Sequence, residues 1–396
     1  MSLLQGWSGW RAFAKLPWAW RHIVVYSESG QDWHQFSGLI RQLNEVLACK
    51  VCYVTSDRAD PGLQRQHPNF VSICIPAGFF LTLFFQVQRS DVTLLTMMDL
   101  GNLHLRRSVH PVHYVYLFHS MGSTHMVDHA DSFDHYDTLF CAGPHQVAEI
   151  RKREALEGLP AKHLFDFGHP RLEQVMREGA AYRAEKTTRG SAQGGPVPVI
   201  LVAPTWGDSA IFNRCGVELI RVLLDSGYEV IMRPHYHSRR LTPEVIESLR
   251  ARYAGHARFS YVDQMGETGS ILRSDLLISD WSAMAIEYAL GLEKPVLFID
   301  VPRRVRNPRW QELGLEPVES SIRSQVGAII PPDRLDTLPQ VVGQLLSQPS
   351  DFSPRMQKLR QQMVFRIGHS IAAGAAEIAR LAEQARTQRP QPGGQR

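Results

Sequence analysis

Two residues with phosphate-binding chemistry flank a proline at the end of a short apolar run. Arg233 and His235 stand on either side of Pro234, directly after the run Glu229–Met232. A guanidinium offers a rigid fork of donors that matches phosphate oxygens, and an imidazole is a donor whose charge switches near neutral pH. Because Pro234 ends the strand and turns the chain, both side chains can point across the strand ends. The tripeptide therefore indicates an anion site.

A second polar loop lies between Leu276–Ile278, which reads as a buried strand, and Ala283–Leu290, which reads as a helix. The loop contains Ser279, Asp280 and Ser282. Free backbone N–H groups at the start of a helix favour an anion, and the Ser282 hydroxyl would add a hydrogen bond to a phosphate there. An ordinary helix cap explains the same serine, so both interpretations stay open.

Two further residues could complete a nucleotide site. Thr205 follows the apolar run Val199–Ala203, so its hydroxyl and the nearby N–H groups could line the same phosphate site. Glu287 lies in the next helix, where a carboxylate can accept both hydroxyls of a ribose. The alternatives are an ordinary strand-to-helix turn with a packed Trp206, and a solvated residue on a helix.

One histidine is a candidate general base. His119 closes the run Val112–Phe118, and the small residues around Gly122 leave room for a substrate. The free pKa of a histidine, about 6.5, suits proton transfer from a hydroxyl. A structural histidine bonded to a loop carbonyl is the alternative. The stretch 125–137, rich in His and Asp, could be read as a metal site, but its spacing matches no metal-ligand template.

Elements that alternate along the chain must position these residues. Short apolar strands alternate with helical or loop segments in both halves, which predicts parallel sheets wound with crossover helices. In such sheets, ligands bind beyond the carboxyl ends of the strands. The sequence predicts two facing Rossmann-like α/β domains and a long C-terminal helix. The predicted ranges are a Trp-rich segment 1–20, a first domain 21–183, a linker 184–198, a second domain 199–350, a helical segment 351–386 and a disordered tail 387–396.

The composition is that of an ordinary soluble globular protein, with 396 residues, 44% of them hydrophobic and 21% charged. A net charge of +4 is too small to indicate a nucleic-acid partner. Five cysteines favour a reducing cytosol, and the Cys49/Cys52 pair is best explained as two structural thiols. No P-loop, G-x-S-x-G, H-E-x-x-H or dinucleotide fingerprint occurs, which disfavours NTPases, hydrolases of that fold, zincins and NAD enzymes.

Two segments bear on membranes. The most apolar stretch, Ala77–Val87, is far shorter than the roughly 20 residues that a spanning helix needs. Residues 1–20 contain four tryptophans with basic residues among them. Tryptophan favours the headgroup region and basic residues attract anionic lipid, so this segment could lie on a membrane surface. Packing of the tryptophans on the first domain is the alternative.

Taken in order, several short blocks resemble the CDP-glycerol glycerophosphotransferase family of teichoic-acid and capsule synthesis. The blocks span roughly residues 115–300. They are Phe118-His119-Ser120 (Trp-His-Gly in the family), Gly168-His169-Pro170-Arg171-Leu172-Glu173 (Gly-Tyr-Pro-Arg-Asn-Asp), Ala203-Pro204-Thr205-Trp206, Arg233-Pro234-His235, Ser274 to Ser282 (ending Thr-Asp-Tyr-Ser in the family) and the turn Lys294-Pro295.

The resemblance implies a GT-B architecture and a metal-independent phosphotransfer that needs no cofactor. The second domain would bind a CDP-linked polyol phosphate, and an acceptor hydroxyl would attack its β-phosphorus and release CMP. By carry-over, His119 is the catalytic base, with His235 the second catalytic candidate. The donor-binding set is Thr205, Arg233, His235, Ser279, Asp280, Ser282 and Glu287.

The residues expected on the acceptor side match the family's motifs less well. Gly122, Ser123 and Arg171 are expected there, but Met121-Gly122-Ser123 replaces the family's Thr-Pro-Leu and Leu172-Glu173 replaces Asn-Asp. The implied acceptor is lipid-linked or a glycan, and the implied location is cytoplasmic, with peripheral association at the inner membrane face. The alternatives are a GT-B nucleotide-sugar glycosyltransferase, a UDP-sugar 2-epimerase and a non-catalytic scaffold with a degenerate site.

Overall fold

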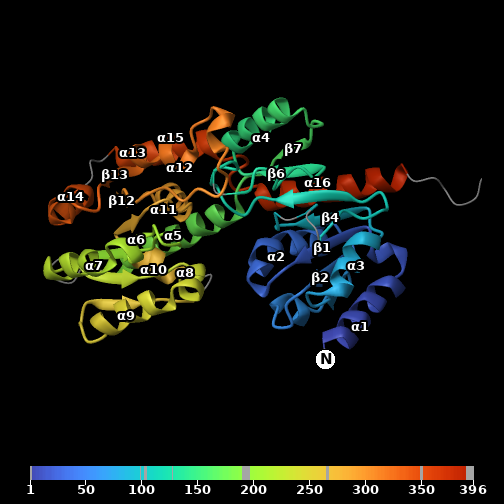
Figure 1. Cartoon of the computed structure of the whole chain (residues 1–396), viewed down its shortest axis with the longest axis horizontal. Helices are drawn as coiled ribbons and strands as arrows, with labels where there is room; N and C mark the ends of the chain where they lie inside the picture. The colour runs from blue at the N-terminus through green and yellow to red at the C-terminus, as the bar shows by residue number, and fades with distance from the viewer. Residues whose placement is uncertain are drawn as a thin grey trace, which may run out of the picture. The chain divides into compact units, whose positions relative to one another are not determined.

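The computed structural model describes residues 2–98, 100–101, 105–126, 128–189, 197–264, 267–347 and 351–388. The chain forms two compact units, each built on one parallel sheet (Figure 1). The first unit contains Met1–His119, Asp128–Pro170 and Val364–Arg396, and the second contains Ser120–Val127 and Arg171–Met363. The chain therefore passes from one unit to the other more than once.

The first unit has a seven-stranded sheet in the order β3-β2-β1-β4-β5-β6-β7. All its neighbouring strands are parallel. Successive residues of the central strands are buried on opposite faces, as expected when helices cover both faces of a parallel sheet. The strands are β1 (Ile23–Ser27), β2 (Val51–Thr55), β3 (Phe70–Cys74), β4 (Val92–Leu95), β5 (His113–Leu117), β6 (Thr138–Cys141) and β7 (His163–Asp166).

Helices cover both faces of this sheet. One apolar cluster joins one face to α2 and α16, and another joins the opposite face to α1, α3 and α4. The helices of the first unit are α1 (Ser2–Lys15), α2 (Trp33–Arg41), α3 (Phe79–Val87), α4 (Pro144–Glu157) and α16 (Ser370–Thr387), with short turns η1 (Trp18–Trp20), η2 (Gly30–Asp32), η3 (Gln42–Val46) and η4 (Pro61–Gln64).

The second unit has a six-stranded parallel sheet in the order β10-β9-β8-β11-β12-β13. Its strands are β8 (Val199–Val202), β9 (Glu229–Met232), β10 (Phe259–Tyr261), β11 (Leu276–Ser279), β12 (Val296–Ile299) and β13 (Gly327–Ile330). Its helices are α5 (Pro170–Arg189), α6 (Ile211–Arg214), α7 (Gly216–Asp225), α8 (Tyr236–Leu241), α9 (Pro243–Tyr253), α10 (Gly269–Arg273), α11 (Met284–Leu292), α12 (Val318–Ser321), α13 (Arg323–Val326), α14 (Leu338–Leu346) and α15 (Phe352–Met363), with η5 (Trp310–Leu313) and η6 (Leu335–Thr337).

The segments between the predicted domains differ from the expectation. Residues 184–189 of the predicted linker continue helix α5, while 190–196 lie outside the described residues. The single C-terminal helix is two helices, α15 and α16, which pack in different units. Thr387 of the predicted tail is the last residue of α16, and 389–396 lie outside the described residues.

The segment that leads into α16 packs very close to Gly168 of the first unit. Gly168 has a φ of +94°, and a Cβ there would lie 2.3 Å from the Phe365 carbonyl oxygen and 2.4 Å from Ser370 Oγ. Phe365 N–H in turn donates to the Ala142 carbonyl oxygen at 2.9 Å. Only glycine meets both demands at this position. The glycine of the Gly168-His169-Pro170 block thus lets the end of the chain pack on the first unit.

The N-terminal segment is the helix α1, which packs on the first unit. Phe13 is 3% exposed and meets Phe84 of α3 edge-on, with ring centroids 4.9 Å apart. The ring centroids of Trp10 and Phe80 are 6.4 Å apart, whereas the side chain of Trp7 is 42% exposed. Packing therefore accounts for part of the tryptophan-rich segment. Within the described ranges, no helix is both long enough and apolar enough to span a membrane.

Candidate functional site

Polar loops gather at one edge of the second unit's sheet. Strands β9, β8 and β11 are neighbours, and Arg233, Thr205 and Ser279 lie at or just beyond their carboxyl ends. Because the strands are parallel, these loops emerge side by side. Within the second unit, the structure thus brings together the predicted loops of Thr205, Arg233 and Ser279.

Asp280 ties two of these loops together from inside the protein. Its buried carboxylate accepts hydrogen bonds from the N–H of Thr205 and of Trp281, both at 2.7 Å. Burial raises the pKa of Asp280 to about 6, and these backbone donors oppose that rise. The side chain fixes the start of the loop after β8 relative to the loop after β11.

The two serines of the Ser279–Ser282 loop differ in accessibility. Ser279 is buried and donates its hydroxyl to the Ala203 carbonyl oxygen at 2.8 Å, so in this structure it joins β11 to β8. Ser282 is half-buried, and its Oγ accepts from Met284 N–H at 3.3 Å at the start of α11. Ser282 therefore contacts the first residue of α11, whose N-cap residue is Ala283, and still has a side open to a ligand.

Arg233 is held in place by two residues that sequence reasoning missed. Its guanidinium donates to Ser270 Oγ at 2.8 Å and to Glu267 at 3.2 Å, and its side chain is 14% exposed. Burial is the main cause that lowers its pKa, and Glu267 opposes this effect. Neither Glu267 nor Ser270 lies in a recognisable motif, so the pairing becomes visible only in the fold.

Arg171 and Glu287 lie near enough to Arg233 to affect it electrostatically. Arg171 lowers the pKa of Arg233 and Glu287 raises it. Arg171 is the second residue of α5, which packs on α11 because Gly291 leaves room for Leu172 and Val175. Arg171 was predicted on the acceptor side of the first domain. The structure places it in the second unit, with the predicted donor residues.

A cationic and aromatic cluster surrounds the loop after β9. The guanidinium of Arg304 stacks on the Trp206 ring at 3.3 Å from its centroid, and His237 lies 4.6 Å from the same ring. His235 stacks on His237 at 5.5 Å. Sequence reasoning missed His237 and Arg304, although the basic run 303–306 after β12 was a visible signal.

The environment of His235 favours the neutral form of its ring, because it lowers the pKa. Its Nδ1 accepts from His237 N–H at 3.1 Å, which caps the start of α8. The pKa of His235 is lowered to about 4, chiefly because the surrounding protein removes water from the ring and secondly because His237 and Arg304 nearby disfavour a positive charge on it. The side chain retains substantial solvent exposure, so water weakens this effect, but the direction still leaves the ring uncharged. A neutral imidazole can donate one hydrogen bond or accept a proton.

The predicted acceptor residues Gly122 and Ser123 also belong to the second unit. Ser123 is buried, and its N–H donates to Glu319 at 2.9 Å. A Cβ on Gly122 would lie 2.6 Å from the same carboxylate. The segment continues along the loop after β12, where the His125 carbonyl accepts from Asn307 Nδ2 at 2.8 Å. The prediction that Gly122 and Ser123 lie in the first domain, 21–183, was therefore wrong.

His119 lies in the first unit, two residues beyond β5, and is exposed. It stands at the carboxyl-end edge of that sheet, as predicted from the run before it. The His- and Asp-rich stretch that follows does not gather as a ligand set. Among the described residues, no three His, Cys, Asp or Glu side chains are grouped so that they could hold a metal ion.

The Lys294-Pro295 turn has an internal role. The ammonium of the half-buried Lys294 donates to the carbonyl oxygens of Leu272 and Ser274, at 2.8 and 2.5 Å, where α10 ends. Burial lowers the pKa of Lys294 to about 8. This residue therefore stabilises the approach to β11.

Two parallel α/β units, each with polar loops beyond its strand ends, define a GT-B-like fold, and known structures agree. The wall teichoic acid polymerase TagF aligns at a TM-score of 0.61 and 14% identity, covering 98% of this chain and 96% of that one. The UDP-GlcNAc 2-epimerase of Methanocaldococcus jannaschii aligns at a TM-score of 0.52 and 12% identity, and the alignment covers 91% of this chain and 99% of that one. MurG of Acinetobacter baumannii aligns at a TM-score of 0.50 and 12% identity, and the alignment covers 90% of this chain and 99% of that one. At these identities the likeness shows the fold.

The family is indicated by the sequence of the central region. Residues 121–302 match the family model of CDP-glycerol:poly(glycerophosphate) glycerophosphotransferase. This match confirms the resemblance predicted from the motifs and identifies a transferase. It covers the loops after β8, β9 and β11. A search of curated protein sequences found no significant match.

Proposed function

We propose that this enzyme transfers a glycerophosphate, or a related polyol phosphate, from a CDP-linked donor to a hydroxyl acceptor during synthesis of a teichoic-acid or capsule-like polymer. One observation carries the proposal. Residues 121–302 match the glycerophosphotransferase family, and this region contains the polar loops that follow the neighbouring strands β8, β9 and β11. The likeness of the fold to that of a wall teichoic acid polymerase supports the same reaction class.

The donor is assigned to the carboxyl-end edge of the second unit. The exposed face of Ser282 and the N–H groups at the start of α11 suit one phosphate, and Arg233 suits the other. Thr205 lines the same edge, and Glu287 is assigned to the ribose hydroxyls. Ser279 and Asp280, both buried, are assigned to positioning these loops.

The transfer needs positioning and charge more than covalent help from the protein. The acceptor oxygen bonds to the β-phosphorus while the bond from that phosphorus to the bridging oxygen breaks. CMP leaves with the bridging oxygen, and the acceptor proton passes to His119. Neutral His235 donates a hydrogen bond to the leaving phosphate, whose negative charge raises the pKa of the ring as it binds. The cations around Trp206 and the helix N-termini supply the positive charge, so the proposal requires no metal ion and no cofactor.

The proposal is tested by offering purified protein CDP-glycerol, CDP-ribitol and a set of UDP-sugars. Release of CMP from a CDP-polyol is expected, and EDTA is expected to leave the rate within about twofold. Turnover of UDP-sugars alone would overturn the phosphotransferase assignment in favour of a glycosyltransferase or a 2-epimerase. No turnover of any donor, with intact folding, would leave a non-catalytic scaffold.

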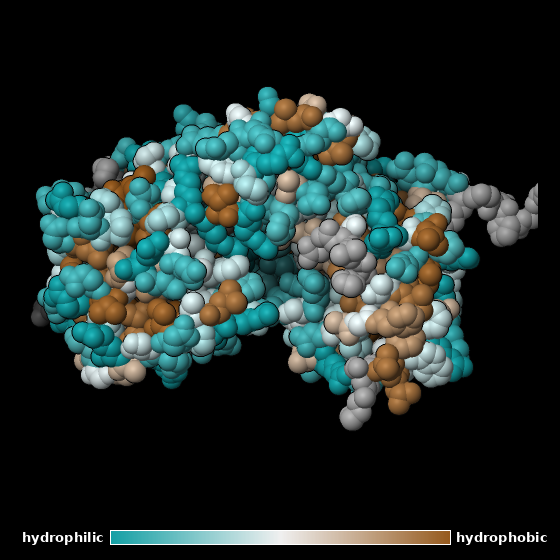
Figure 2. All heavy atoms as spheres, in the orientation of Figure 1, coloured by the Kyte–Doolittle hydropathy of each residue, from teal (hydrophilic) through white to brown (hydrophobic). Residues whose placement is uncertain are grey.

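We also propose peripheral association with an anionic membrane at its cytoplasmic face, where the five free thiols are expected to remain reduced. Helix α1 has no acidic residue, and its Arg11 lies 4.9 Å from the centre of the Trp7 ring. Figure 2 shows apolar residues over the region of α1 and α3. The exposed apolar side chains there, here called the α1/α3 patch, are Leu3 (65% exposed), Leu4 (75%), Trp7 (42%) and Phe79 (65%).

The double variant Leu4→Glu, Trp7→Glu is expected to reduce sedimentation with anionic vesicles about tenfold, because it replaces apolar contacts by like charges at an anionic surface. These point changes spare Phe13, which deletion of residues 2–20 would remove from the core. Leu156→Glu, at an exposed position on α4, is the control. Equal sedimentation of both proteins would reject the membrane surface.

A further inference from the structure

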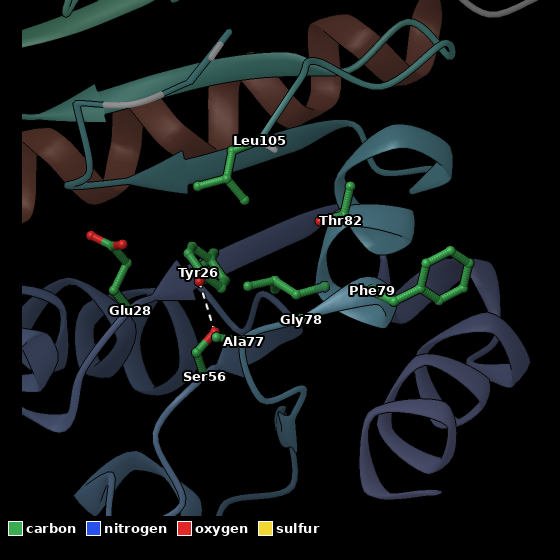
Figure 3. A pocket seen from close by; sticks show the side chains of 9 residues that line it. Tyr26, Glu28, Ser56, Ala77, Gly78, Phe79, Thr82 and Leu105 are labelled. Atoms are coloured by element: carbon green, nitrogen blue, oxygen red, sulfur yellow. Dashed lines mark hydrogen bonds between the residues drawn. The ribbon is translucent and has the colours of Figure 1, made fainter. Parts of the chain in front are cut away.

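The candidate base His119 stands at a hollow edge of the first unit. A cavity of about 660 Å³ opens beyond the carboxyl ends of β1 and β2, where its lining includes Glu28 and Ser56 (Figure 3). His119 follows β5 at the same edge of the sheet and is exposed. An exposed side chain exchanges rotamers rapidly, so the backbone on either side of His119 decides how well its ring is aimed.

The segment that follows His119, here called the 120–126 loop, is unusual. Residues 121–126 are all buried, although no helix or strand includes them. Loops normally lie on the surface, because a buried backbone must find a partner for each N–H and C=O group. The chain passes from the first unit to the second between His119 and Ser120, so the 120–126 loop is buried within the second unit. Its partners there determine where it lies.

Glu319 of α12 holds the first half of the 120–126 loop. Its side chain is buried, and its Oε1 accepts from Ser123 N–H at 2.9 Å. A Cβ on Gly122 would lie 2.6 Å from the same oxygen, so alanine there would displace the carboxylate. Gly122 N–H in turn donates to Ser120 Oγ at 3.1 Å. These contacts fix the residues that directly follow the candidate base.

Asn307, in the loop after β12, holds the second half. Its Nδ2 donates to the His125 carbonyl oxygen at 2.8 Å, and its N–H donates to the next carbonyl oxygen along the chain at 3.3 Å. The loop after β12 also carries Arg304, whose guanidinium stacks on Trp206. The 120–126 loop is therefore fastened to a segment that reaches the residues assigned to the donor.

The connection of this loop to His119 is covalent. Consecutive Cα atoms are ~3.8 Å apart, so a loop fixed from Ser120 onward limits how far the backbone of His119 can move. Proton transfer from a hydroxyl needs heavy atoms within about 2.6–3.2 Å, and a displacement of ~1 Å can lower a rate about a hundredfold. A residue that fixes this loop can thus control the rate through His119.

From these observations we infer that Glu319 is a positioning residue for the transfer reaction, which acts by holding the loop that sets the place of His119. The inference rests on the proposed function, in which His119 accepts the proton of the acceptor hydroxyl. Loss of the Glu319 carboxylate should therefore slow the chemical step and leave donor binding unchanged. Arg233 differs in this respect, because its loss should weaken donor binding.

The test compares Glu319→Ala with the conservative variant Glu319→Gln, by CMP release from CDP-glycerol and by calorimetry with CDP. Glu319→Ala is expected to lower kcat about thirtyfold and to leave the affinity for CDP within about twofold. Glu319→Gln should recover kcat to within about threefold of wild type, because its amide oxygen can accept from Ser123 N–H. Glu316→Ala, at an exposed position three residues earlier, is the matched control and should retain full activity.

A double-mutant cycle shows whether Glu319 acts through His119. In the His119→Ala background, Glu319→Ala should lower the residual turnover by less than about threefold, because a residue that aims a base has no effect once the base is gone. A thirtyfold loss in both backgrounds would overturn the inference. A loss of CDP affinity as large as the loss of kcat would overturn it too.

If Glu319→Ala disturbs folding, as a lowered unfolding midpoint would show, Asn307→Asp replaces it in the same cycle. This variant removes the donor to the His125 carbonyl oxygen with almost no change of size. It should lower kcat about tenfold in the wild-type background and by less than about threefold beside His119→Ala. Equal losses in the two backgrounds would reject the positioning role.

Wild-type activity separates this inference from the proposed function. Normal CMP release by wild type, with Glu319→Ala within about twofold of that rate, would reject the positioning role alone. Turnover of a UDP-sugar alone, with the same dependence on Glu319 and His119, would reject the proposed function and retain the positioning role.

Discussion

His119→Ala is expected to lower the turnover number for CDP-polyol transfer about a thousandfold while leaving the affinity for CDP within about twofold. A positioned general base contributes ~10²–10⁴-fold to a rate, and alanine removes the only group to which we assign the acceptor proton. Donor affinity should persist because His119 is in the first unit, whereas the residues assigned to the donor are in the second. Stopped assays of CMP release give the rate, and calorimetry with CDP gives the affinity.

His129→Ala is the matched control, since it removes an exposed histidine of the same unit from the His- and Asp-rich stretch. It should retain full activity. Turnover by His119→Ala within about threefold of wild type would remove His119 from the mechanism. Loss of activity in both variants together would instead favour a role for the whole stretch.

Arg233→Ala is expected to weaken CDP binding about a hundredfold and to lower kcat/KM by at least as much. A hydrogen bond to a charged group is worth ~1.5–3 kcal/mol, and the guanidinium offers two donors in one plane. Arg233→Lys should recover only part of the loss, because an ammonium keeps the charge but lacks the fork. Calorimetry with CDP and steady-state kinetics with CDP-glycerol measure both effects.

A purely structural role for Arg233 must be separated from ligand binding, because its guanidinium is bonded to Glu267 and Ser270. Glu267→Gln removes the charge of the supporting partner and should leave CDP affinity within about threefold. Arg252→Ala, at an exposed position on α9, controls for the loss of one surface cation. If Arg233→Ala lowers the unfolding midpoint but leaves CDP affinity unchanged, Arg233 only stabilises the second unit.

The grouping of Thr205, Arg233 and Ser282 was predictable because it depends on a local rule. Each follows an apolar strand, and parallel strands place their carboxyl ends at one edge. Glu267 and Ser270 were not predictable, because they reach the same region from segments without a motif, whereas Arg304 belongs to a basic run that the sequence shows. Their positions depend on how loops of different length cross the sheet, which periodicity does not encode.

The course of the chain between the units was equally hidden. Residues 120–126 follow a strand of the first unit but pack against Glu319 and Asn307 of the second. Helix α16 follows α15 along the chain, but its apolar face completes the cluster around α2. Both outcomes are decided by contacts between distant segments. Local patterns predicted helices and strands but not the unit in which each would be buried.

The late position of α16 in the chain affects how the protein is made. Ala375, Ile378 and Leu381 fill a core whose other members lie mainly between Ile23 and Phe167. Until the ribosome has added α16, that core lacks one of its covering helices, and part of the apolar face of the sheet stays exposed to water. A nascent chain can thus finish the second unit first, and its earliest residues must remain unaggregated until α16 emerges.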